Sequence, residues 1–174
     1  MDLEVTIDAL LATARATAVA AGDLTHDIFT QPRDLHGKGS NDIVTDADFA
    51  AQRLITNAIR EQFPDHGFLP EEKRPDLPAT GPIIWIVDPV DGTQNYSRQQ
   101  PLYCVSVAAA QPQADGSYRP LAGAIYDPMR RELFSAAKGQ GAWLNDQPLT
   151  TSSVDQLDAV FLGVDWSYNR RRQQ

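Results

Sequence analysis

The chain has 174 residues, of which 42% are hydrophobic and 22% charged, a composition typical of a globular domain and not of a disordered chain. Its formal net charge of −8 argues against a general nucleic-acid surface or an anionic-membrane surface, and suits a site that collects carboxylates to hold cations. A single cysteine, Cys104, allows no intrachain disulfide, and no signal or membrane-spanning segment is found, so the expected location is the cytoplasm.

Two helices with a hairpin between them are predicted for the first third of the chain. Apolar residues at helical spacing over 3–21 predict the first helix, with Gly22 as its stop. Residues 23–44 are rich in polar residues, glycine and proline, which predicts a loop with a short hairpin around Gly37 and Gly39.

The second helix is predicted from 45 to about 62, where Pro64 ends it. A short strand is expected at 67–69, followed by a proline-rich surface connection at 73–82. Residues 83–87 form a continuous apolar run of strand length, typical of a strand covered on both faces.

The remainder of the chain predicts strands separated by turns, and therefore an α+β fold in which helices come first and strands follow. Cys104 falls in one of the apolar runs and is expected to be a small buried hydrophobe. A last strand is expected at 159–164 without neighbours after it, which would leave apolar surface exposed and favour self-association. The other predicted strands lie at 103–110, 121–126 and 132–136, with a hairpin at 142–149.

The most informative stretch follows the apolar run at 83–87. The strand delivers Asp88 to its carboxyl end, Pro89 ends the ladder, and Gly92 permits a tight turn. Asp88 and Asp91 can then point at one centre with the Val90 carbonyl between them. Three hard oxygens that converge in this way suit Mg²⁺.

Thr93 is placed to cap a short helix, so that the amides of Gly92 and Thr93 would form an anion site beside the cations. Metal ligands together with phosphate-binding amides are what hydrolysis of a phosphate ester needs. The alternative is an ordinary turn, since Asp-Pro and Asp-Gly are both common turn pairs.

Three other segments carry charged residues whose roles the pattern leaves open. Either Glu71 or Glu72 would reach the same centre while the other stays solvated, or both form a solvated surface. Asp48 follows Thr45 by three residues, which is also the pattern of a helix capping box. Lys38 lies between two glycines, as a cation near a phosphate or as an exposed loop lysine.

Taken in order, these segments resemble the inositol monophosphatase family, and the resemblance extends from the first helix nearly to the end of the chain. It implies a layered sandwich of the sugar-phosphatase type, in which two N-terminal helices cover a mostly antiparallel sheet. The expected division is a metal-binding domain at 1–158 and the start of a C-terminal α/β domain, otherwise largely missing, at 159–174. The stretches that carry the resemblance are 38–48, 68–72, 85–96 and 138–145.

The same resemblance implies a set of metal ligands. Glu71 and Asp88, with the Val90 carbonyl, would bind a first Mg²⁺, while Asp88 and Asp91 would share a second. Lys38 would lie on a loop near a third, weaker metal.

Catalytic and phosphate-binding roles are implied in the same way. Thr93, hydrogen-bonded to Asp48, would position and deprotonate the attacking water, and Glu71 would act with them. Gly92 and Thr93 would hold the phosphate.

The implied activity is hydrolysis of a phosphate monoester of a polyol or sugar by a Mg²⁺-dependent, lithium-sensitive phosphatase that uses two or three ions. A homodimer is implied for any full-length form. Fructose-1,6-bisphosphatase, histidinol-phosphatase and phosphoadenosine-phosphatase preferences stay open within the family. So does a catalytically inactive metal-binding fragment, or a split-subunit or interaction protein.

Two departures from the family pattern bear on these expectations. Pro70 stands where the family usually has glycine before the paired glutamates, which fixes the backbone and removes an amide donor next to Glu71. The family's later Trp-Asp motif is not found, because none of Trp85, Trp143 and Trp166 is followed by aspartate.

Overall fold

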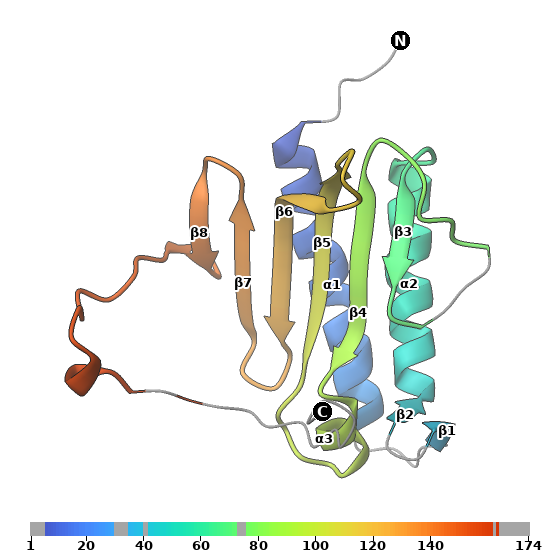
Figure 1. Cartoon of the computed structure of the whole chain (residues 1–174). Coiled ribbons are helices and arrows are strands. Elements are labelled where there is room, and N and C mark those ends of the chain that lie inside the picture. The colour runs from blue at the N-terminus through green and yellow to red at the C-terminus, as the bar shows by residue number, and fades with distance from the viewer. Residues whose placement is uncertain (1–5, 30–34, 40–41, 73–75, 162, 164–174) are drawn as a thin grey trace, which may run out of the picture.

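The computed structural model describes residues 6–29, 35–39, 42–72, 76–161 and 163, with the backbone alone at 35–39 and 42–45. Two long helices, α1 (Ile7–Phe29) and α2 (Asp46–Gln62), lie on one face of a sheet. The opposite face is turned toward the viewer in Figure 1 and is called the open face below. Within the described residues, the helix layer and the sheet form the α+β arrangement that the sequence predicts.

Helix α1 runs seven residues beyond Gly22, so the prediction that this glycine ends the helix is wrong. Gly22 is buried where the helix passes over the sheet, and a Cβ at this position would lie 2.3 Å from Cδ1 of Tyr126. The residue is glycine because helix and strand approach closely, not because the helix stops. The first part of the predicted loop at 23–44 is accordingly helical.

The second helix and the hairpin before it are confirmed. Strand β1 (Leu35–Gly39) pairs antiparallel with β2 (Asp42–Thr45), and α2 follows directly. The α2 stripe of Ala51, Ile55 and Ile59 is fully buried against the sheet.

In the described part of the chain, seven strands form one sheet in the order β3-β4-β5-β6-β7-β8-β9. Only β3 and β4 are parallel. Short turns join the strands from β5 to β9, and residues 92–103, which include a short helix, join β4 to β5, so each of these connections reverses the chain. Asn145, at the predicted turn, has a positive φ of 53° between β8 and β9. The strands are β3 (Gly67–Pro70), β4 (Ile84–Asp91), β5 (Cys104–Pro112), β6 (Tyr118–Asp127), β7 (Glu132–Ala137), β8 (Gly141–Leu144) and β9 (Gln147–Pro148).

The core lies between the sheet and the two helices. Along β5, Val105, Val107 and Ala109 are buried beneath α1, while Cys104 and Ser106 on the alternate face are only half-buried. This alternation is typical of a sheet with one covered face. The strand expected at 83–87 to be covered on both faces is so covered at its start, where the successive residues Ile84 and Trp85 are both 0% exposed, whereas Ile86 is half-buried.

A small aromatic cluster closes the core where α2 ends. The imidazole of His66 stacks on Phe63 with ring centroids 4.6 Å apart, and the indole Nε1 of Trp85 donates a 2.9 Å hydrogen bond to His66 Nδ1. Burial lowers the pKa of His66, although the nearby carboxylate of Asp65 raises it in part. His66 is thus a neutral acceptor within the core.

The chain leaves the sheet after β9 in an extended path away from the body of the domain (Figure 1). The strand predicted at 159–164 is not formed over 159–161, where a short 3-10 turn (Leu157–Ala159) ends instead; most of the expected second domain, 159–174, lies outside the described residues. None of the helices described is both long enough and apolar enough to cross a membrane.

Candidate functional site

An irregularity in β4 brings two aspartates to one face of the sheet. Asp88 pairs with Ser106 on β5 and Asp91 pairs with Cys104, so four residues of β4 lie opposite three of β5. Residues three apart on a regular strand point to opposite faces, but the extra residue of this β-bulge turns both aspartates to the open face. The prediction that Pro89 ends the ladder is wrong, because Pro89 lies inside the bulge and the strand continues to Asp91.

Glu71 reaches the same place from the neighbouring strand. Its backbone amide donates a 2.9 Å hydrogen bond to the Val87 carbonyl, which continues the β3–β4 pairing, and its exposed carboxylate is hydrogen-bonded to Asp88. Burial is the main cause, and the charges of Glu71 and Asp91 the next, that raise the pKa of Asp88 to about 8. A 3.2 Å hydrogen bond donated by the Val90 amide to Asp88 acts in the opposite direction and lowers this pKa in part. The three carboxylates are therefore close enough to repel one another.

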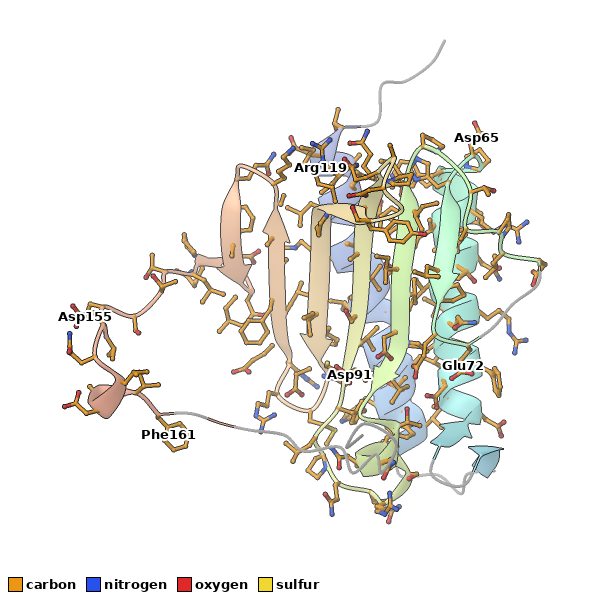
Figure 2. All side chains as sticks on the ribbon, in the orientation of Figure 1. Asp65, Glu72, Asp91, Arg119, Asp155 and Phe161 are labelled. Atoms are coloured by element: carbon orange, nitrogen blue, oxygen red, sulfur yellow. The ribbon has the colours of Figure 1, made fainter. Side chains whose placement is uncertain are left out.

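The two adjacent glutamates have opposite environments, but the second one is not solvated as expected. Glu72 is only 3% exposed and lies between β3 and α2, as Figure 2 shows. The side chain of Gln52 on α2 is paired twice with the backbone of Glu72, accepting from its amide at 3.0 Å and donating to its carbonyl at 2.8 Å. These two bonds fix the backbone on which Glu71 sits.

The predicted contact between Thr93 and Asp48 is present in the structure. Thr93 Oγ1 lies 3.2 Å from Asp48 Oδ1 and 2.9 Å from the Val90 carbonyl, so its single proton is shared between two acceptors. Asp48 is fully buried at the start of α2, whereas the side chain of Thr45, its partner in the alternative capping box, lies outside the described residues.

Gly92, and not Thr93, is the N-cap of the short helix α3 (Thr93–Ser97). Gly92 has a φ of 100°, and a Cβ there would lie 2.8 Å from the Leu102 carbonyl. Only glycine fits this left-handed and crowded position. The turn after Asp91 therefore presents Gly92 and Thr93 at the α3 end of the sheet, where Figure 2 also places Asp91.

Cys104 is a neighbour of the site that sequence reasoning missed. It was expected to be a buried hydrophobe, but it is half-buried on the open face, and its thiol donates toward Asp91 Oδ2 across 3.8 Å. Burial, then the charges of Asp91 and Asp88, raise the pKa of Cys104 to about 12, so the thiol stays protonated. Side chains alternate between the two faces of a strand, so the burial of Val105 under α1 predicts that its neighbour Cys104 lies on the open face.

Oxygen donors make this group of residues suitable for Mg²⁺. Among the described residues, no group of three or more His, Cys, Asp and Glu side chains already has the arrangement of a metal site. The donors nevertheless fit, because a divalent cation would offset both the burial and the neighbouring charges that raise the Asp88 pKa. The side chain of Lys38, expected near a third metal, lies outside the described residues.

Comparison with known proteins assigns the family. The model of the inositol monophosphatase family matches residues 6–174. The chain belongs to the inositol monophosphatase family.

This chain covers only about half of the length of its curated relatives. Inositol monophosphatase 1 of Solanum lycopersicum is 35% identical over 162 residues, which cover 91% of this chain and 58% of the relative. The Nus factor SuhB of Escherichia coli (strain K12) is 37% identical over 135 residues, or 78% of this chain and 49% of the relative. The chain thus corresponds to the N-terminal part of the inositol monophosphatase family and spans about half the length of these relatives.

Solved structures show the same relationship for the fold. The extragenic suppressor protein suhB of Bartonella henselae superposes with a TM-score of 0.74 at 32% identity, over 84% of this chain and 55% of that one. The IMPase of Thermotoga maritima superposes with a TM-score of 0.72 at 29% identity, over 82% and 54% of the two chains. Two helices on a mostly antiparallel sheet are therefore the inositol monophosphatase fold, present over about half its length.

Proposed function

We propose that this chain carries the metal-binding and phosphate-binding part of a Mg²⁺-dependent phosphomonoesterase that acts on a phosphorylated polyol or sugar. The observation that supports this most is the bulge in β4, which turns Asp88 and Asp91 to one face beside the carboxylate of Glu71. Burial and the charges of two neighbouring carboxylates raise the pKa of Asp88, and a bound cation would favour its charged form. The family assignment makes phosphate-ester hydrolysis the expected use of such a cation.

Glu71, Asp88, Asp91 and the Val90 carbonyl would hold the metal ions. Bound Mg²⁺ would neutralise the phosphate and increase the acidity of a water molecule. The carboxylates of the chain bind and space the ions, and the bulge keeps the two aspartates on a common face. Because phosphoryl transfer depends mainly on positioning and charge neutralisation, few other groups are required.

Thr93 and Asp48 are proposed to position the attacking water. When the Thr93 hydroxyl donates its proton to Asp48, a lone pair on the same oxygen is free to accept a proton from water. Asp48 is buried and Thr93 is held by α3, so the pair is fixed before substrate arrives. The amides of Gly92 and Thr93 would bind the phosphate oxygens.

The proposal is tested by phosphate release from inositol 1-phosphate across a Mg²⁺ titration. Asp91→Asn is expected to abolish release or lower it at least about a hundredfold, because a proposed metal ligand and its charge are lost. Thr93→Ala should lower kcat while leaving Mg²⁺ binding nearly unchanged. Asp115→Asn is the matched control, since Asp115 is an exposed aspartate in the β5–β6 turn.

Metal binding without turnover is the second candidate function, favoured by the chain covering only about half of the length of its relatives. Calorimetry distinguishes the two. Mg²⁺ binding that depends on Asp91, with no phosphate release, would identify a metal-binding module, whereas absence of both binding and release would refute each candidate. Substrate preference within the family would follow from comparing inositol 1-phosphate with fructose 1,6-bisphosphate, histidinol phosphate and phosphoadenosine phosphate.

A further inference from the structure

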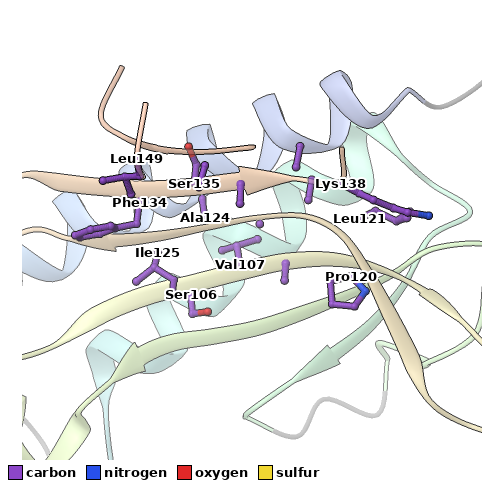
Figure 3. Close-up of a pocket in the computed structure, with 16 residues that line it drawn as sticks. Ser106, Val107, Pro120, Leu121, Ala124, Ile125, Phe134, Ser135, Lys138 and Leu149 are labelled. Carbon is purple, nitrogen blue, oxygen red and sulfur yellow. The ribbon is translucent and has the colours of Figure 1, made fainter. Parts of the chain in front are cut away.

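The turn that carries the proposed phosphate-binding amides lies outside the groove of the open face. That groove is lined mainly by residues of β5, β6 and β7, as Figure 3 shows. Its described lining includes neither Gly92 nor Thr93. The turn is held instead by the helix that follows it, α3, and by the residues against which this helix packs.

A second, smaller core cluster joins the elements that carry the proposed site. Val90 in the bulge of β4 offers its carbonyl to the proposed metal ions, and Ala47 directly precedes Asp48 on α2. Because both side chains are fully buried in this cluster, their packing fixes the backbone of the site. The buried members come from the end of α1, the start of α2, β4, α3 and the residue before β5: Phe29, Ala47, Val90, Tyr96 and Tyr103.

Tyr96 is the member of this cluster that ties α3 to the end of α1. Its hydroxyl donates a 2.8 Å hydrogen bond to the Thr25 carbonyl, and its ring meets that of Phe29 edge to face with centroids 5.4 Å apart. Its backbone amide donates a 2.9 Å hydrogen bond to the Gly92 carbonyl, which closes the first turn of α3. One fully buried residue thus connects the turn after Asp91 with a helix 71 positions earlier in the chain.

The neighbouring side chain on α3 is also bonded, but in a different environment. Asn95 Nδ2 donates a 2.9 Å hydrogen bond to the Leu102 carbonyl, and this contact is exposed. Water can replace an exposed hydrogen bond, whereas the loss of a buried donor is not made good by solvent. The position of α3 therefore depends more on Tyr96 than on Asn95.

We propose that Tyr96 is a positioning residue, whose hydroxyl holds α3 so that Gly92 and Thr93 face the phosphate. The inference rests on the proposed function, because it concerns the phosphate-binding turn of that site. The metal-binding carboxylates do not depend on the contact, since the bulge of β4 and the pairing of β3 with β4 place them. Phosphate binding and the attack of water therefore require Tyr96, whereas Mg²⁺ binding does not.

Hydrogen exchange of the backbone amides tests the anchoring without any ligand. Tyr96→Phe keeps the ring and removes the hydroxyl, so the amides of 92–97 should exchange about three- to tenfold faster, the effect of losing one buried hydrogen bond. Tyr126→Phe is the matched control, because the Tyr126 hydroxyl donates to Asp23, also on α1, at 3.3 Å but from β6. The control should leave exchange at 92–97 unchanged. Equal exchange in Tyr96→Phe and the unmodified chain would overturn the proposal.

A second variant removes a different part of the same anchor. Phe29→Leu keeps an apolar side chain at the end of α1 and loses the edge-to-face contact with Tyr96. It should speed exchange at 92–97 in the same direction, and it replaces Tyr96→Phe if circular dichroism shows that variant to be unfolded.

Calorimetry with inorganic phosphate at saturating Mg²⁺ tests the consequence for the site. Tyr96→Phe should weaken phosphate binding about three- to tenfold and lower kcat for inositol 1-phosphate by a similar factor, with Mg²⁺ affinity unchanged. A merely structural role would weaken Mg²⁺ and phosphate binding together, and that result, or an unchanged phosphate affinity, would overturn the proposal. Tyr126→Phe should keep both affinities. If the unmodified chain itself binds no phosphate, the proposed phosphate site is wrong and the positioning role falls with it, a result distinct from any difference between the variants.

Discussion

Mg²⁺ binding is expected to strengthen as the pH rises toward about 8, because Asp88 and Glu71 share a proton that must leave before both can hold a cation. Burial and the neighbouring charges raise the pKa of Asp88 to about 8. Below that pH, the apparent dissociation constant for Mg²⁺ should increase about tenfold for each pH unit, since about one proton is displaced for each ion bound. The expected loss of affinity from about pH 8 to about pH 6 is therefore about a hundredfold.

The assay is isothermal titration calorimetry in two buffers that differ in ionisation enthalpy. Proton release should be close to about one per ion at neutral pH and should vanish well above the Asp88 pKa. Glu71→Gln should weaken binding and also reduce proton release, because the charge and hydrogen bond that raise the pKa are lost. Asp115→Asn should keep the pH dependence of the unmodified chain. Equal affinity at acidic and alkaline pH would refute the reasoning.

Without bound metal, the same shared proton determines whether this group's contribution to the free energy of unfolding rises or falls with pH. The folded-state pKa of Asp88 lies above its ordinary value of 3.8, so the folded chain binds a proton that the unfolded chain has already released. In the absence of Mg²⁺, this group's contribution to the free energy of unfolding is therefore full below pH 3.8 and is lost as the pH rises toward about 8. Saturating Mg²⁺ should oppose that loss, and urea titrations with and without the ion measure the difference.

Three further changes test how the scaffold is held. Gly22→Ala should lower the free energy of unfolding by about 1–2 kcal/mol, since the clash with Tyr126 outweighs the gain of about 1 kcal/mol in helix propensity; a more stable variant by urea denaturation would contradict this. Stability should fall as the pH drops below about 6.5, because protonation of His66 removes the acceptor for Trp85, and His66→Gln should flatten that dependence. Gln52→Leu should cost about 2–4 kcal/mol by leaving two buried backbone groups unpaired, and should weaken Mg²⁺ binding as well; unchanged calorimetry would argue against a positioning role.

Secondary structure was predictable wherever local chemistry decides it. The apolar stripe of α2 fixes its length, Pro64 marks its end, and alternation with turn residues predicts β5 to β9. The stretch that resembles the inositol monophosphatase family also indicated the mostly antiparallel sheet.

Errors occurred where a distant partner overrides the local signal. Gly22 looks like a helix stop until Tyr126 is seen packed against it, and Pro89 looks like the end of a strand until β5 is seen pairing across the bulge. Neither partner is near in sequence, so periodicity alone does not reveal them.

The residues of the candidate site were also predictable only in part. The pattern alone grouped Asp88 and Asp91 as possible metal ligands but left an ordinary turn open as the alternative, and it left Asp48 as a possible helix cap. The resemblance to a family was needed to join Asp48 and Thr93 to them. Gln52 and Cys104 were missed because each acts through a contact across strands or layers. For Gln52, one local sign of a structural partner was present: it is a polar residue on the buried face of α2.

The bulge in β4 limits how this segment can change in evolution. A regular ladder over the same residues would turn Asp91 toward the helix-covered face, where a carboxylate would meet apolar neighbours such as Val105 and Val107. With the bulge retained, inserting or deleting one residue between Asp88 and Asp91 would have the same effect. The number of residues that separates the two acidic side chains can therefore change only together with the bulge.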